Sequence, residues 1–192
     1  MLDSAVVNST KNPQGLSACE KKQLGLAPRI EDAELRTRWI RGQWNGILTH
    51  FFNGYHPRVF KDPSTYYFLM RDRGDVTAFR FVFIAQVNDS ADLSNADRRQ
   101  ALDADMRKRL AEISSESLLQ VFHGVSIIGT RMRFYWFDKR SGHIAPPVSS
   151  NIEDWEADIT DDKGYEALAT LSRSIPGATS EVGEIPERFR KP

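Results

Sequence analysis

The residues with the clearest potential for chemistry lie on either side of a long apolar run. Asp72 and Asp75 precede the run, and Gln86 and Asn88 end it. Two carboxylates on neighbouring strands, with a lysine beside the second, would hold a divalent cation and activate an attacking water. Gln86 and Asn88 carry neutral amides, which are weak ligands for Mg²⁺ and supply no cation. The residues by themselves therefore form no complete metal site, and they imply Mg²⁺ only if all four act together.

Other catalytic constellations are incomplete. The four histidines lie on different predicted elements without metal-ligand spacing, which favours structural or surface roles. Cys19 is the single cysteine, so neither an intrachain disulfide nor a cysteine-rich zinc site can form. The Gly-x-Ser-x-Gly elbow, the phosphate-binding loops and the protein-kinase signatures are absent from the sequence. Outside the Mg²⁺ alternative, we therefore predict no catalytic residues, no metal and no cofactor.

Basic residues near a predicted hairpin offer a different chemistry, the recognition of a partner. Arg131, Arg133, Lys139 and Arg140 lie close together in sequence around an aromatic pair, as in surfaces that bind single-stranded nucleic acid. Acidic residues are interleaved with them, which favours a solvated surface of mixed charge. We predict these four as surface binding residues, with a protein partner favoured over nucleic acid.

The composition is that of a globular protein. The 192 residues are 40% hydrophobic and 27% charged, and the formal net charge is zero, so no global field attracts nucleic acid or anionic lipid. The first residues lack the pattern of a secretory signal, and no apolar stretch approaches the roughly 18 residues of a membrane span. We expect the cytoplasm or the nucleus, and no membrane association.

Apolar periodicity predicts the elements that position these residues. Helices are predicted over 31–52, 96–113 and 165–175. Strands are predicted over 66–70, 78–87, 118–128 and 132–137. Gly129-Thr130 separates the last two strands and predicts a hairpin with a type II′ turn.

The two ends of the chain differ from this central part. Residues 1–28 are polar and punctuated by Pro and Gly, which predicts a flexible N-terminal arm, and 176–192 reads as a C-terminal tail or linker. A single α/β domain is therefore predicted over 29–175. Six large apolar residues occupy inward-facing positions of the periodic segments, and we predict that they share one core: Trp39, Trp44, Phe51, Phe83, Ile127 and Trp136.

The order of elements predicts the fold class. Helix, two strands, helix, two strands and helix indicate an α/β (α+β) fold, with a small mixed sheet flanked by helices. This order also resembles the restriction-endonuclease-like fold, whose nucleases place an acidic residue on one strand and Glu/Asp-x-Lys on the next. The resemblance implies that Asp72 or Asp75 supplies the first carboxylate. Gln86-Val87-Asn88 would then replace Glu-x-Lys, which leaves a degenerate PD-(D/E)xK-like site.

The segment from Val121 to Gly142 carries a second resemblance. It contains an apolar strand, a Gly turn, a Met-Arg-aromatic strand and then Asp-Lys-Arg-Ser-Gly. This is similar to the region that precedes the catalytic domain in the fungal-type protein kinases, where the pattern ends in Asp-Arg-x-Gly, so one residue is inserted here. The matching order of elements extends the resemblance over 31–175. It implies an accessory domain whose nuclease-like fold has lost its chemistry, with the kinase domain absent.

Three functions follow as hypotheses. The first is a non-catalytic intracellular accessory domain that binds another protein, or a kinase domain in cis or in trans. The second is a metal-dependent nuclease with a degenerate site. The third is an effector that acts inside a host cell and shares the predicted fold. The sequence favours a protein without enzymatic activity over the nuclease.

Overall fold

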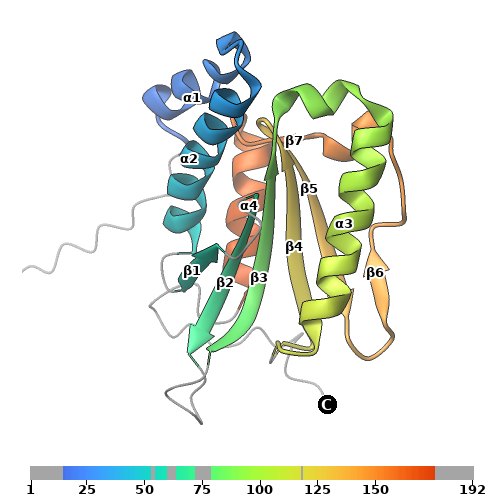
Figure 1. Cartoon of the computed structure of the whole chain (residues 1–192). Coiled ribbons are helices and arrows are strands. Elements are labelled where there is room, and N and C mark those ends of the chain that lie inside the picture. The colour runs from blue at the N-terminus through green and yellow to red at the C-terminus, as the bar shows by residue number, and fades with distance from the viewer. Residues whose placement is uncertain (1–14, 53–54, 60–63, 72–78, 118, 176–192) are drawn as a thin grey trace, which may run out of the picture.

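The computed structural model describes residues 15–52, 55–59, 64–71, 79–117 and 119–175. In these ranges, helices pack against both faces of one mixed sheet (Figure 1). The predicted α/β fold around a mixed sheet is confirmed. Within the same ranges, no helix combines the length and the apolarity needed to cross a bilayer.

The elements follow the predicted order, and the structure adds a short helix, three short strands and three 3₁₀ turns in the described ranges. The helices are α1 (Ala18–Leu24), α2 (Ala33–Phe51), α3 (Ala96–Ser114) and α4 (Asp162–Ser174), with the 3₁₀ turns η1 (Ala27–Arg29), η2 (Ser90–Ser94) and η3 (Ile152–Trp155). The strands are β1 (His56–Val59), β2 (Thr65–Arg71), β3 (Phe79–Asn88), β4 (Val121–Ile128), β5 (Arg131–Asp138), β6 (His143–Ala145) and β7 (Ala157–Asp158). Sequence analysis found α2, α3, α4 and the four long strands, and it missed α1, β1, β6 and β7.

The sheet has the strand order β1-β2-β3-β4-β5-β6, and β7 pairs with β5. Strands β3 and β4 are parallel, and the other neighbours are antiparallel. A parallel pair requires a long crossover, which α3 provides. In the β4–β5 hairpin, Gly129 has a φ of +64° and Thr130 does not have a positive φ, as a type II′ turn requires.

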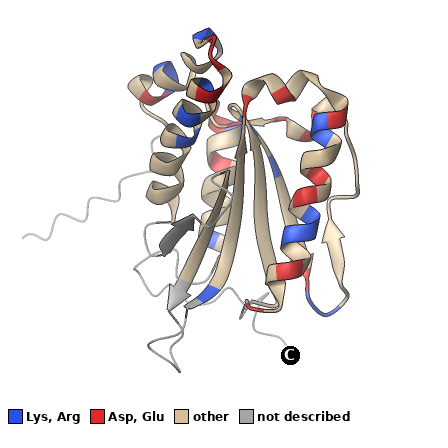
Figure 2. Ribbon diagram, in the orientation of Figure 1, with Lys and Arg blue, Asp and Glu red and all other residues tan. Residues whose placement is uncertain are grey.

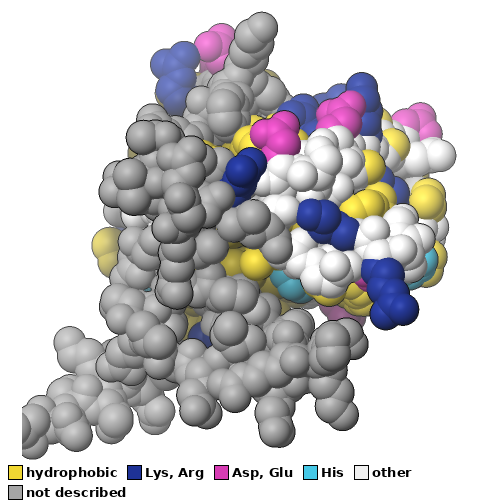
Figure 3. Space-filling view, turned by 90° about the horizontal axis from the view of Figure 1, so that it is seen from below, with side chains coloured by type: hydrophobic (Ala, Val, Ile, Leu, Met, Phe, Trp, Pro, Cys, Tyr) yellow, Lys and Arg dark blue, Asp and Glu magenta, His cyan; other side chains and the backbone are white. Residues whose placement is uncertain are grey.

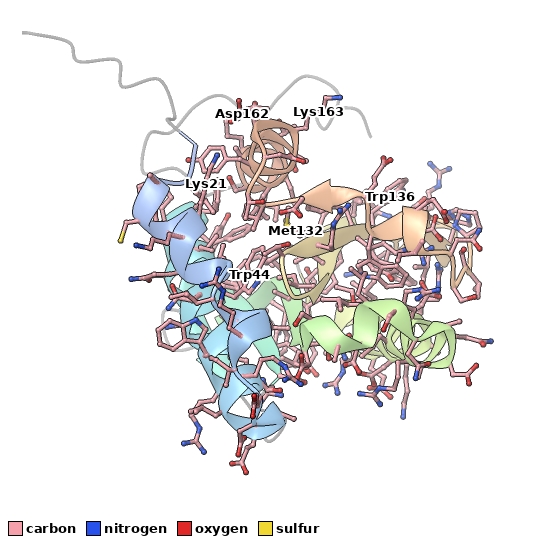
Figure 4. The ribbon with its side chains drawn as sticks, turned by 90° about the horizontal axis from the view of Figure 1, so that it is seen from above. Lys21, Trp44, Met132, Trp136, Asp162 and Lys163 are labelled. Atoms are coloured by element: carbon pink, nitrogen blue, oxygen red, sulfur yellow. The ribbon has the colours of Figure 1, made fainter. Side chains whose placement is uncertain are left out.

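The helices divide between the two faces of the sheet. Buried residues of α2 and α4 share one core with the inward side chains of β3 and β4, whereas α3 packs on the opposite face. Figure 4, seen from above, shows α3 and α4 on opposite sides of the sheet. Trp44 ties α2 to the hairpin, because its indole Nε1 donates to the carbonyl of Gly129 at 2.7 Å.

The predicted core is correct in part. Trp44, Phe83 and Ile127 are buried, but Trp39 and Trp136 are 37% and 45% exposed. Trp39 precedes Trp44 by five residues, which places it about 140° away around the helix, on the outward face. Trp136 lies on the sheet face that α4 covers, but near the β6 edge (Figure 4). Periodicity thus predicted the helix and the strand correctly, but it did not show which of their side chains the neighbouring elements bury.

The prediction of a flexible arm is wrong for residues 15–28. Ser17 caps α1 and forms a capping box with Glu20, and α1 packs beside α2 (Figure 1). Leu16, Leu24 and Ala27 are buried in the core that contains α2 and α4. A seven-residue helix with few apolar residues leaves little periodicity to detect. Residues 1–14 and the predicted tail over 176–192 lie outside the described residues.

Candidate functional site

Gln86 lies near the end of β3, in the interior of the sheet. Its neighbours in register are Thr65 on β2 and Ser126 on β4, and all three residues are buried. Ile84, two residues earlier, packs against α3, so alternation places Gln86 on the same face. The sheet therefore holds an amide in the layer below α3, where an unmet hydrogen bond is costly.

Helix α3 supplies the partners of Gln86. Its Nε2 donates to Asp105 Oδ2 at 2.6 Å, and Arg109 Nε donates to the same oxygen at 2.8 Å. Arg109 Nη1 donates to the hydroxyl of Tyr67 at 3.1 Å. Burial acts to lower the pKa of Arg109, but the hydrogen bonds to Asp105 and Tyr67 outweigh it and raise that pKa. The Asp105 carboxylate is thus shared by an amide and a permanent cation.

Two polar atoms beside this network lack a partner among the described residues. They are Gln86 Oε1 and Ser126 Oγ, and both are buried. The two residues are direct neighbours on parallel strands, so an acceptor and a hydroxyl lie side by side under α3. A buried water with several polar contacts commonly satisfies such a pair.

The other predicted site residues do not join this network. Asn88 donates from Nδ2 to the carbonyl of Ile127 at 3.2 Å, which is a structural contact between β3 and β4. Asp72 and Asp75 lie outside the described residues. The predicted group of Asp72, Asp75, Gln86 and Asn88 is therefore described only in its last two members, which point to different partners.

The described part of this site does not fit a divalent cation. In the described ranges, no three His, Cys, Asp or Glu side chains gather as metal ligands. Asp105 is the carboxylate that contacts Gln86, and its contacting oxygen also accepts from Arg109. That oxygen is therefore already paired with a guanidinium and is not a free ligand for Mg²⁺.

A second polar cluster lies further along the same face, and sequence analysis did not identify it. The fully buried carboxylate of Asp103 pairs with Arg107 at 2.7 Å and with Arg133 at 3.1 Å, and it accepts from the Tyr135 hydroxyl at 2.9 Å. Burial first, and then the charge of Asp103, raises the pKa of Tyr135. The four-residue spacing of Asp103 and Arg107 on a helix was the available signal.

This cluster also fixes the chain that follows β6. Arg133 donates to the carbonyls of Pro147 and Ser149 at 2.7 and 2.9 Å. Arg99 on α3 donates to the carbonyl of Ser150 at 2.8 Å. Since an irregular segment must satisfy its backbone carbonyls, the arginines act here as structural donors. The cluster therefore holds α3, β5 and the segment 146–151 together through hydrogen bonds.

The predicted basic surface requires a correction. Arg133 is 2% exposed and belongs to the Asp103 cluster, so it is not a surface residue. Arg131 begins β5, while Lys139 and Arg140 follow its other end, more than roughly 25 Å away at strand geometry. Figure 2 shows acidic and basic residues interspersed on α3, and Figure 3 shows basic side chains scattered over the lower face. The four residues do not form one patch.

The outward face of α2 carries two of the exposed large hydrophobic side chains in the described part of the chain. Leu35 and Trp39 are 53% and 37% exposed and lie one turn apart. Gly42 and Gly46 continue the same face at helical spacing, and a Cβ added at either would meet nothing within 4 Å. We call Leu35, Trp39, Gly42 and Gly46 the α2 surface.

The histidines serve no shared site among the described residues. His50 and His143 are exposed on different elements, and His123 lies on β4 between Phe83 and Trp136. Burial lowers the pKa of His123 to about 4, so it is neutral at physiological pH. This agrees with the predicted structural role of that residue.

Comparisons with known proteins identify no relative. No protein-family model, no curated protein and no solved structure matches this chain.

Proposed function

We propose that this chain is a non-catalytic binding domain that recognises another protein through the α2 surface. The observation that carries the proposal is the exposure of Leu35 and Trp39 on one helix face. An aromatic side chain beside an aliphatic one is a common anchor in protein interfaces. The partner fitted to such a face is an amphipathic helix that buries its own apolar stripe against Leu35 and Trp39.

The two glycines support this choice of surface. Glycine in a helix interior destabilises the helix by about 1 kcal/mol relative to alanine. Gly42 and Gly46 face open space, so packing within the described part of the chain does not require them. A partner helix that approaches the α2 backbone closely would require small residues at these positions. The glycines thus favour a partner that packs along the helix, beyond the anchor pair.

The polar residues of the sheet support the non-catalytic part of the proposal. Gln86 and Asp105 are engaged with each other, and Arg109 holds the same carboxylate oxygen. We therefore expect no cleavage of DNA or RNA by the purified chain with Mg²⁺ or Mn²⁺. Metal-dependent cleavage that Asp105→Asn abolishes would overturn this part. An effector role would use the same surface with a host protein as partner.

The resemblance to the region before the catalytic domain of fungal-type protein kinases suggests the class of partner. We include in the proposal that the α2 surface contacts a kinase catalytic domain, in cis or in trans. Titration of such a purified catalytic domain with this chain, by calorimetry, tests this narrower statement. Heat that is lost with Trp39→Ala and retained with Trp136→Ala supports it, and equal heats for both variants contradict it.

The broader proposal is tested by capture from native extract with matched variants. Trp39→Ala and Leu35→Ala remove the anchors, and Trp136→Ala removes a comparably exposed tryptophan elsewhere. We expect a protein that is retained by the wild type and by Trp136→Ala, and lost with both α2 variants. Unchanged thermal midpoints show that the variants are folded. Identical sets of captured proteins for all four chains would refute the α2 surface as the binding site.

A further inference from the structure

A pocket lies between η2 and η3, beside the Asp103 cluster, whose Arg133 packs on the ring of the lining residue Trp155. Its volume is about 330 Å³, and its lining comprises Leu93, Arg131, Ile152, Glu153, Trp155 and Glu156. The two 3₁₀ turns supply five of these residues or their caps, and β5 supplies the other. The pocket is therefore a feature of one end of the sheet, where two short connections meet.

The geometry of η3 sorts its side chains into two stripes. A 3₁₀ helix has three residues per turn, so residues three apart eclipse one another. Ile152 therefore lies above Trp155, and Glu153 above Glu156, whose backbone continues the helical conformation. One stripe is apolar and the other is acidic. Leu93 on η2 adds a third apolar residue to the lining.

The charges of this pocket are unbalanced. Its basic lining residue, Arg131, pairs with Asp158 at 3.3 Å and donates to the backbone carbonyl of Glu156 at 3.3 Å. Neither Glu153 nor Glu156 has a side-chain hydrogen bond or an ion pair with the described residues. Two exposed carboxylates thus remain available to a cation beside an apolar lining.

A buried donor in the same pocket also lacks a partner. Trp155 is fully buried, and its indole Nε1 has no acceptor among the described residues. The guanidinium of Arg133 lies 5.0 Å from the ring centroid and fixes the ring from the sheet side. Because this nitrogen is enclosed, its N–H signal reports on the pocket lining without itself contacting a ligand.

We infer that this pocket binds an arginine side chain of a polypeptide partner. The aliphatic stem would pack on Leu93 and Ile152, and the guanidinium would pair with Glu153 and Glu156. The planar fork of arginine suits two carboxylates better than the point charge of lysine does. The site is distinct from the α2 surface and does not depend on it.

The test uses the full chain with N-acetyl-arginine amide as the probe and N-acetyl-citrulline amide as its neutral analogue. Nuclear magnetic resonance follows the indole N–H of Trp155 and the backbone amides of Leu93 and Ile152. The probe is titrated to about 50 mM, because a ligand of this size binds in the millimolar range. The double variant Glu153→Gln/Glu156→Gln removes the acidic stripe, and Glu116→Gln, an exposed glutamate on another part of the surface, is the control.

We expect saturable shifts with the arginine probe and an affinity at least about fivefold lower in the double variant. The citrulline probe is expected to shift the same signals weakly, and Glu116→Gln to behave as the wild type. Unchanged unfolding midpoints are expected for all variants, because the two glutamates have no partner in the described chain. The inference is overturned if the wild type shows no saturable shift, if citrulline binds equally, or if the double variant binds as the wild type does.

Discussion

At the scale of single residues, burial decides what the charged side chains of this protein do. Asp103 holds two arginines and a tyrosine hydroxyl inside the layer between α3 and the sheet. Its partner Arg133 was predicted on the surface, because a basic residue in a strand is usually solvated. The contact joins residues thirty positions apart, so no local pattern could reveal it.

The first prediction concerns this buried carboxylate. Asp103→Ala removes the carboxylate that Arg107 and Arg133 share. This strands the charge of Arg107 and leaves Arg133 with the more distant Asp154 at 3.5 Å, which should lower the free energy of unfolding by about 3–5 kcal/mol. Urea denaturation measures the loss. In an Arg133→Met background, the same substitution should cost less, because one of the stranded charges is gone. Additive losses in the double variant would show that the two residues are not coupled.

The second prediction concerns His123, whose pKa burial lowers from 6.5 to about 4. Below pH 6.5, the unfolded chain binds a proton that the folded chain does not, so the free energy of unfolding falls as the pH falls towards 4. This single group should cost about 2 kcal/mol at pH 5 and about 3 kcal/mol below pH 4.

Urea midpoints measured at neutral pH and at about pH 5 test the effect. His123→Gln should flatten the dependence, whereas His143→Gln, at an exposed position, should leave it as in the wild type. A wild-type slope in His123→Gln would assign the pH dependence to other groups.

At the scale of elements, the sequence was informative where a pattern is local. The β4–β5 hairpin follows from two apolar runs around Gly129-Thr130, and helices α2 and α3 follow from their periodicity. The contact between Gln86 and Asp105 depends instead on how the α3 crossover packs on the sheet. Sequence analysis could therefore name Gln86 but could not name its partner.

The third prediction compares two helical glycines in opposite environments. A Cβ at Gly164 would lie 1.8 Å from the carbonyl oxygen of Asp158, so Gly164→Ala must displace α4 from β7 and lower stability. The same change at Gly46 meets open space and should raise stability by up to about 1 kcal/mol through helix propensity. Thermal midpoints of the two variants should therefore move in opposite directions. Shifts of the same sign would contradict this packing of α4 against β7.

At the scale of the whole molecule, the folded unit begins earlier than composition indicated. Polar residues punctuated by Gly and Pro were expected to form an arm, but Leu16, Leu24 and Ala27 fill the core beside α2 and α4. Three buried side chains are too few to create a periodic signal, and their burial depends on contacts with the sheet and α4, which lie far along the sequence. The N-terminal limit of the domain thus follows from packing and not from composition.

The last prediction measures what this N-terminal segment contributes. A chain that starts at residue 15 keeps α1, and one that starts at residue 29 loses it. Burying a leucine side chain stabilises a fold by about 1.5–3 kcal/mol, and the ordering of a short helix offsets part of this. We therefore expect the shorter chain to be less stable by about 2–5 kcal/mol in urea denaturation. Ser17→Ala in the longer chain should cost about 1 kcal/mol, since it removes the cap of α1. Equal urea midpoints for the two chains would mean that α1 lies on the core without stabilising it.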